Sequence, residues 1–166
     1  MTREELIKSI SKRECHIPEV VHDLIRRAIS EDEKVEGRYL KALTVEIKEK
    51  KISTKQYDYY VVTESKFVRI HASELELWFK LCPLDKFMGL EEKTLPDLSV
   101  FGVEDIDLFI DAGFPGEMQV KIHFGVSDED LHQITFTSKE PVEKKRIKEF
   151  VSCVATAVSN GWEENE

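Results

Sequence analysis

Histidines and nearby carboxylates are the side chains of this sequence with the clearest capacity for chemistry. The five histidines are His16, His22, His71, His123 and His132. A zinc site needs three or four converging ligands, and these positions contain no HxxxH or HExxH spacing. We therefore expect no metal site. A metal-assisted hydrolase that uses His16, His22 and nearby carboxylates ranks third among the functional hypotheses.

The sequence contains no complete motif for nucleophilic catalysis or for phosphate binding. No GxSxG elbow surrounds a serine, and the seven glycines include no GxxxxGK spacing. Ser127 and Ser138 suit turn or cap positions, and Cys153 falls on the apolar side of a predicted helix. We therefore expect a non-enzymatic protein without a cofactor.

Lysines gather in residues 48–55, a segment that could bind an anionic ligand or a membrane surface. The candidate anion-binding residues are Lys48, Lys50, Lys51 and Lys55. The chain carries a formal charge of −9 and has a pI of about 5.2, so it repels the phosphate backbone of nucleic acids at long range. We expect no nucleic-acid partner, and anionic-ligand binding at the lysines is the alternative function.

Apolar side chains at predicted surface positions supply a second kind of binding surface. Phe114-Pro115-Gly116 is predicted to form an apolar loop tip, and Trp162 lies beyond the predicted end of the last helix. The helical stripe near the N-terminus must also be buried, either on the rest of the chain or on a second copy. Both arrangements stay open. The candidate protein-interface residues are Phe114, Pro115, Trp162, Leu6 and Ile10.

Composition favours a globular protein of the cytoplasm. Of the 166 residues, 41% are hydrophobic and 34% are charged, which is enough apolar material for one core. The three cysteines are widely spaced and form no CxxC pair, so we expect free thiols. The N-terminal residues lack the apolar region of a signal peptide, and no apolar run approaches the roughly 18–20 residues of a spanning helix. We expect a protein that is not transmembrane.

The first 36 residues predict an N-terminal helical arm. Apolar residues recur at helical spacing in two stretches, separated by a break at residues 15–17, and Pro18 suits the first turn of the second helix. A charged run follows at residues 31–34, before Gly37. We therefore predict two domains, residues 1–36 and residues 37–166.

Residues 37–166 predict an antiparallel β-domain that ends in a helix. Leu43, Val45 and Ile47 alternate with polar residues, as in a strand with one buried face, and a lysine-rich loop over residues 48–55 follows. Pro141 opens an amphipathic C-terminal helix, and Gly161 is predicted to cap it. The other predicted strands cover residues 57–63, 66–71, 75–81, 100–110, 118–124 and 132–136.

The order of these elements resembles that of pleckstrin-homology-like domains of bacteria and archaea. The similarity covers residues 37–162, and its most suggestive part is YVVTESKFVRI at residues 60–70. The resemblance implies a bent antiparallel sheet or barrel closed by the C-terminal helix, and it implies no enzyme. It also implies that basic residues of the first hairpin loop bind lipid headgroups, and the lysines of residues 48–55 occupy a similar place. The fold class that we predict is α+β.

The preferred function is therefore a non-enzymatic binding or scaffolding module that mediates protein association, including self-association into a homo-oligomer. The aromatic loops or the helical arm would supply the interface.

Overall fold

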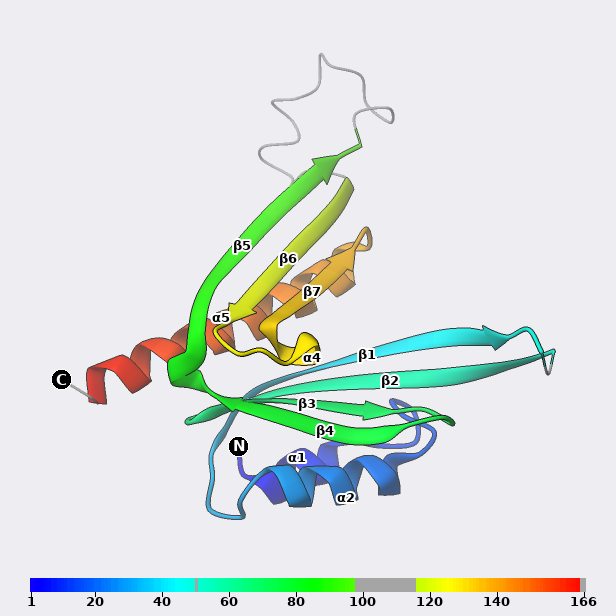
Figure 1. Cartoon of the computed structure of the whole chain (residues 1–166), viewed down its shortest axis with the longest axis horizontal. Helices are drawn as coiled ribbons and strands as arrows, with labels where there is room; N and C mark the ends of the chain where they lie inside the picture. Colours follow the sequence, from blue (N-terminus) through cyan, green and yellow to red (C-terminus); the bar gives the residue numbers. More distant parts are fainter. Residues whose placement is uncertain (50, 98–115, 165–166) are drawn as a thin grey trace. The chain divides into compact units, whose positions relative to one another are not determined.

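The α+β class predicted from the sequence is confirmed. The computed structural model in Figure 1 describes residues 1–49, 51–97 and 116–164, which form four α-helices and two antiparallel sheets. The chain divides into two compact units. The first contains Met1–Lys86 and Phe150–Glu166, and the second contains Phe87–Glu149. The N-terminal helices and the first four strands therefore belong to one unit.

Two helices begin the first unit. Helix α1 (Arg3–Ser9) is capped by the Thr2 hydroxyl, which accepts a hydrogen bond from the Glu5 amide, and α2 (Pro18–Ala28) has Pro18 in its first turn. Their apolar stripes meet the sheet, and α2 packs against β3 (Lys66–Ala72) and β4 (Leu77–Pro83), as Figure 1 shows.

The sheet of the first unit has the order β1-β2-β3-β4. Strands β1 (Val35–Ile47) and β2 (Ile52–Thr63) form a long hairpin, and β2 pairs with β3 from Tyr57 to Val62. The predicted hairpin over residues 57–63 and 66–71 is confirmed, and the strand predicted at residues 75–81 corresponds to β4. The predicted loop at residues 48–55 is wrong in part, because β2 already begins at Ile52.

The two faces of this sheet bury different neighbours. One face carries Tyr59, Val61 and Ile70, which pack with the helix pair in a single core cluster. The opposite face carries Tyr39 and Phe67, whose rings each lie 6.1 Å from the ring of Phe150 in the C-terminal helix. Alternation of side chains along the strands produces both faces, so the sheet is buried on each side where these elements cover it.

The second unit contains a three-stranded sheet of order β5-β6-β7. Its strands are β5 (Phe87–Pro96), β6 (Gly116–Phe124) and β7 (Gln133–Ser138), with the short helix α4 (Glu129–His132) between the last two. The predicted hairpin of residues 118–124 and 132–136 is confirmed. Strand β5 was not predicted. Phe87 and Gly89 are half-buried, and the other residues of β5 are exposed. The charged segment at residues 91–93 shows no alternation of apolar and polar residues.

The C-terminal helix α5 (Pro141–Glu164) is the longest helix of the chain. Its buried stripe includes Ile147, Phe150, Val154 and Val158, as the sequence predicted. The predicted cap at Gly161 is wrong, because the helix continues through this residue. Trp162 therefore lies within the helix and does not fold back from beyond a cap. Its side chain is 57% exposed.

The predicted closed barrel is also wrong for the part of the chain that the structure describes. Two separate sheets are present, and both are open. Pro83 ends β4 and has no N–H to extend the ladder, and the 3₁₀ turn η1 (Leu84–Lys86) then takes the chain out of the first sheet before β5 begins. The strand predicted at residues 100–110 lies outside the described residues.

Candidate functional site

The distal half of the β1–β2 hairpin forms a two-stranded arm. Strand β3 pairs with β2 only from Tyr57 onward, whereas β1 and β2 remain paired from Leu43↔Gln56 to Ile47↔Ile52. Residues 43–56, which we call the β1–β2 arm, therefore continue beyond the ends of β3 and β4, as Figure 1 shows. An isolated two-stranded ribbon is only marginally stable in water, so a surface that covers this arm would stabilise it.

One face of the β1–β2 arm carries exposed apolar side chains. Leu43 and Val45 are two residues apart on β1 and so share a face, and they are 41% and 38% exposed. Ile52 lies on the same face of β2 because it pairs with Ile47, and it is 45% exposed. The alternation at Leu43 and Val45 was predicted to reflect a buried face, and this prediction is wrong.

Among the described residues, no strand pairs with the outer edge of the β1–β2 arm. Strand β1 is an edge strand of its sheet and is 13 residues long. No proline interrupts it. Edge strands in natural proteins are usually short, bulged or covered by another element, because their unpaired N–H and C=O groups recruit other strands. An edge strand of 13 residues is therefore long. An open edge and an apolar face therefore coincide on the same segment.

The tip of the β1–β2 arm is basic. Lys48 and Lys51 lie in the turn at the tip, whereas Lys55 pairs with Thr44 nearer the base of the arm. All three are exposed, and none of them forms an ion pair with any described residue. Lys51 has a φ of 52°, so the turn itself holds a left-handed residue. Lys50, the fourth predicted anion-binding residue, lies outside the described residues. Four lysines against two glutamates give the arm a formal charge of +2 in a chain of charge −9.

A polar cluster lies at the base of the β1–β2 arm. The Oδ1 atom of Asp58, which is 4% exposed, accepts hydrogen bonds from Arg69 Nε at 3.3 Å and Arg69 Nη2 at 3.1 Å. The same oxygen lies 3.0 Å from His71 Nδ1. The His71 imidazole stacks on Trp78 with a centroid distance of 5.0 Å, and the Arg69 guanidinium lies 5.5 Å from the same indole ring.

This cluster holds strands together and lacks the parts of a hydrolytic site. An imidazole oriented by a carboxylate could act as a general base, but no serine, threonine or cysteine within the described ranges hydrogen bonds to His71. Arg69 instead forms an ion pair with Asp58 across β2 and β3, and the His71 imidazole lies within hydrogen-bond distance of the same carboxylate. We assign the cluster the role of fixing the register at the root of the arm.

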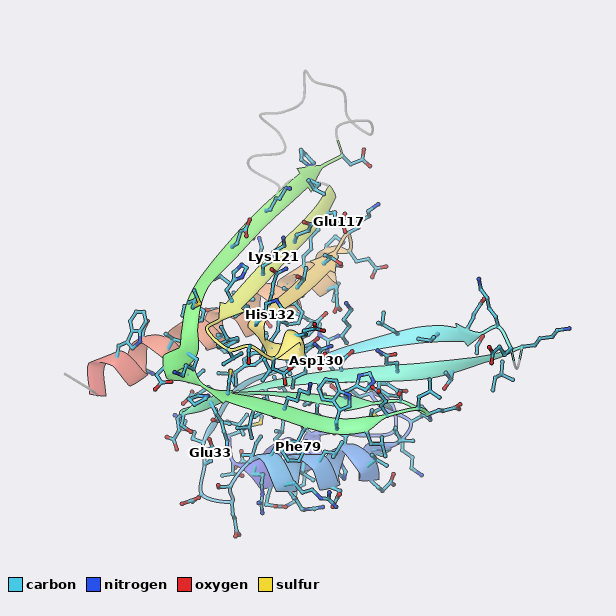
Figure 2. The ribbon with its side chains drawn as sticks, viewed as in Figure 1. Glu33, Phe79, Glu117, Lys121, Asp130 and His132 are labelled. Atoms are coloured by element: carbon cyan, nitrogen blue, oxygen red, sulfur yellow. The ribbon has the colours of Figure 1, made fainter. Side chains whose placement is uncertain are left out.

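Glu33 forms a second buried polar network, at the connector between α2 and β1, where Figure 2 labels it. Its carboxylate accepts hydrogen bonds from Thr63 Oγ1 at 2.6 Å and Ser65 Oγ at 2.7 Å, and it lies 3.1 Å from Lys66 Nζ. Burial raises the pKa of Glu33. The hydrogen bonds and the charge of Lys66 together lower it by more than burial raises it, so the pKa lies below its ordinary value. The network ties the connector to the β2–β3 turn.

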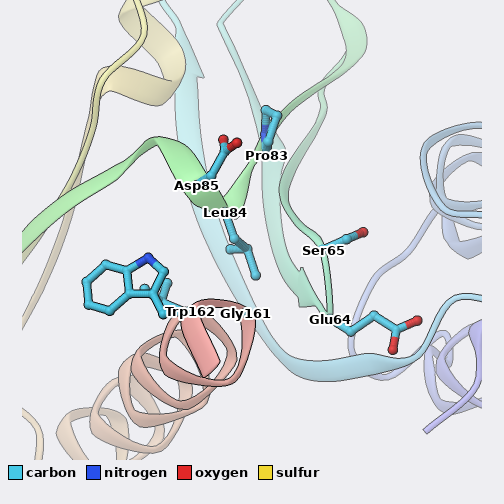
Figure 3. Close-up of a pocket in the computed structure, with 8 residues that line it drawn as sticks. Glu64, Ser65, Pro83, Leu84, Asp85, Gly161 and Trp162 are labelled. Atoms are coloured by element: carbon cyan, nitrogen blue, oxygen red, sulfur yellow. The ribbon is translucent and has the colours of Figure 1, made fainter. Parts of the chain in front are cut away.

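A pocket of about 240 Å³ opens beside the end of α5, as Figure 3 shows. Leu84 and Val158 are its buried apolar residues, and Trp162 lines one side. Its carboxylates, Glu64 and Asp85, are both exposed. A pocket without buried, convergent polar groups does not have the arrangement of an enzyme site.

The candidate interface residues of the helical arm are in the core. Leu6 and Ile10 are 0% and 3% exposed, so the N-terminal stripe packs on the sheet of its own unit and is not free to bind a partner. Trp162 is exposed and remains available. Phe114 and Pro115 lie outside the described residues.

The histidines of the hydrolase hypothesis each have other partners. His16 Nδ1 lies 2.6 Å from the Tyr57 hydroxyl, and His22 Nε2 lies 3.2 Å from the Ile10 carbonyl oxygen. No group of three or more histidines, cysteines or acidic residues suited to a metal ion occurs in the described part of the chain. No observation on the structure favours metal-assisted hydrolysis.

Comparison of the chain with protein-family models, with curated proteins and with solved structures finds no match. Among the described residues, no helix combines the length and the apolar character needed to cross a membrane. The β1–β2 arm combines an open strand edge, exposed apolar side chains and a basic tip on one segment. The sequence pattern could not distinguish its apolar face from the buried face of a strand.

Proposed function

We propose that this chain is a non-enzymatic binding module that associates with a protein partner through its β1–β2 arm. One observation carries the proposal. The same segment has an open strand edge and the exposed apolar side chains of Leu43, Val45 and Ile52. Addition of a strand to such an edge supplies main-chain hydrogen bonds, and the apolar face supplies buried area. The arm replaces the helical arm and the aromatic loops as the preferred interface.

The order of elements supports a pleckstrin-homology-like architecture for this module. The resemblance implies a run of six or seven strands followed by a C-terminal helix, and the described residues contain seven strands before α5. Strands β2 and β3, with the turn between them, contain the segment of residues 60–70 that carries the similarity. The free thiols of Cys15 and Cys82 agree with a cytoplasmic location for the module.

Site-specific photo-crosslinking tests the proposed function and captures the partner directly. A benzophenone amino acid replaces Val45 in the full chain, in cells that naturally produce it. The matched control carries the same probe at Val142, which is 74% exposed on α5. We expect a discrete crosslinked protein with the probe at residue 45 and none at residue 142. Equal crosslinking at both positions, or none at residue 45, would overturn the proposal.

Anionic-surface binding is the second candidate function, and the basic tip of the β1–β2 arm favours it. Exposed lysines that form no ion pair with a described residue attract anions over about 8–10 Å at physiological salt. The charge of the rest of the chain opposes such binding, which is why this function ranks second.

Vesicle sedimentation tests this second function. Vesicles with anionic lipids should bind the protein, and Lys48→Glu with Lys51→Glu should abolish the binding. The control, Lys139→Glu with Lys145→Glu, changes the net charge equally at exposed positions outside the arm and should retain it. Unchanged binding by the Lys48→Glu, Lys51→Glu variant would exclude the arm tip as the anion site.

A further inference from the structure

The open edge of β1 has a sequence that is complementary to itself. In an antiparallel pair related by a two-fold axis perpendicular to the sheet, directly opposite residues must lie on the same face of their strands. With the axis at Thr44, Leu43 of one chain faces Val45 of the other, and the reverse pair forms as well. The four exposed apolar side chains then make one continuous stripe across the two strands.

Other registers of the same pairing are less favourable. An axis at Leu43 places Lys41 opposite Val45, so that Leu43 against Leu43 is the one pair left between the exposed residues Leu43 and Val45. With the axis at Thr44, Lys41 lies opposite Ile47 instead, outside the two Leu43–Val45 pairs. An axis at Val45 shortens the paired part of β1 from residues 41–47 to residues 43–47. A register with Thr44 on the axis retains both the apolar contact and the longer ladder.

Charge also favours an antiparallel pair of identical arms. In the register centred on Thr44, Lys48 of one chain lies opposite Leu40 of the other. Lys48 of the other chain is eight residues away from that position along the strand. At about 3.4 Å per residue the two basic tips are roughly 27 Å apart, well beyond the Debye length of about 8–10 Å. Repulsion between the tips is therefore screened, whereas a parallel pair would place the lysines side by side.

We infer that two copies of this chain associate by antiparallel pairing of their β1 edges, with Thr44 on the two-fold axis. The inference rests on the proposed function, because it names a second copy as the protein that the β1–β2 arm binds. The pairing joins the two four-stranded sheets into one continuous eight-stranded sheet and brings Leu43 of each chain into contact with Val45 of the other.

Cysteine crosslinking tests both the partner and the register. In a Cys153→Ser background the remaining native thiols, Cys15 and Cys82, are buried. Thr44→Cys should form an intermolecular disulfide on mild oxidation, because directly opposite Cβ atoms lie about 4.5–5.5 Å apart. Glu46→Cys alone should not crosslink, since it is exposed on the same face but two residues from the axis. Glu46→Cys mixed with Ala42→Cys should crosslink, since these residues face each other.

Sedimentation velocity of the purified full chain provides the equilibrium measurement. The wild-type chain should show a monomer–dimer equilibrium, and Leu43→Asn should raise its dissociation constant about tenfold or more. Val142→Asn, which removes a more exposed apolar side chain from α5, should leave the constant unchanged. Circular dichroism confirms that both variants are folded.

Three outcomes overturn the inference: monomers at every concentration, Glu46→Cys crosslinking alone as fast as Thr44→Cys, or equal effects of the two asparagine variants. The crosslinking at residue 45 in cells separates this failure from failure of the proposed function. A monomeric purified chain whose residue 45 still captures a different protein overturns the second-copy inference and leaves the proposed function standing. The lack of any residue 45 crosslink in cells overturns the proposed function.

Discussion

The carboxylate of Asp58 and the imidazole of His71 face each other across β2 and β3, with Oδ1 and Nδ1 3.0 Å apart and both side chains almost fully buried. Arg69 completes this arrangement from the same strand as His71. The β1–β2 arm begins directly beyond this point, so the cluster lies at the end of the regular four-stranded sheet.

Replacing Asp58 by Asn should lower the free energy of unfolding by about 3 kcal/mol, because Arg69 would lose the carboxylate that compensates its charge. Urea denaturation measures the change. The control is Asp23→Asn, which removes an exposed ion pair with Arg27 and should cost less than about 1 kcal/mol. Similar losses for the two variants would contradict the role given to the cluster.

The Glu33 network should make the first unit sensitive to acid. A carboxyl whose pKa is lowered in the folded state stabilises the fold above its unfolded pKa of about 4.3, and the stabilisation is lost as the pH falls through the lower folded value. Glu33→Gln should therefore flatten the fall of unfolding free energy below about pH 4.5. Glu31→Gln, at an exposed position, should retain the wild-type slope, and an unchanged slope in Glu33→Gln would refute the prediction.

Gly37 is required where β1 meets α5. A Cβ at this position would lie 2.6 Å from the Cβ of Cys153, so Gly37→Ala must displace the helix or the strand. We expect a loss of about 1–3 kcal/mol in thermal or urea unfolding. Gly89→Ala is the matched strand variant, because no atom lies within 4 Å of its new methyl group. A larger loss in Gly89→Ala than in Gly37→Ala would contradict this packing.

Phe150 should be a principal contact between α5 and the sheet of the first unit. Phe150→Ala removes its ring from Tyr39 and Phe67 and should cost about 3–5 kcal/mol of unfolding free energy. Val142→Ala on the same helix, at a position 74% exposed, should change the stability by less than about 0.5 kcal/mol. Equal stability of the two variants would show that the ring is not in the core.

Secondary structure was predictable where side chains alternate or repeat strongly. The β-branched and aromatic residues from Tyr57 to Ile70 predicted the hairpin of β2 and β3, and the stripe from Ile147 to Val158 predicted α5. The prediction failed for β5, where Glu91 and its charged neighbours show no alternation between two faces. It also failed at Gly161, because a helix tolerates a glycine near its end.

The candidate site was less predictable than the fold. Leu43 and Val45 alternate just as buried strand residues do, so only the end of β3 pairing shows that they are exposed. Lys48, Lys51 and Lys55 were recognised from composition, but their places on the projecting hairpin, with Lys48 and Lys51 at its tip and Lys55 opposite Thr44, depend on the register of β1 and β2. Leu6 and Ile10 were ambiguous for the opposite reason, since an apolar helical stripe does not identify what covers it.

The lysines of the β1–β2 arm have a consequence for the unfolded and newly made chain. A long strand edge with apolar side chains is a template for cross-β aggregation, and charged residues beside such a segment act as gatekeepers against it. Lys48, Lys51 and Lys55 stand beside Leu43, Val45 and Ile52 in this way. The same lysines that could attract an anion thus oppose uncontrolled growth of the sheet, and they help to confine its pairing to a defined partner.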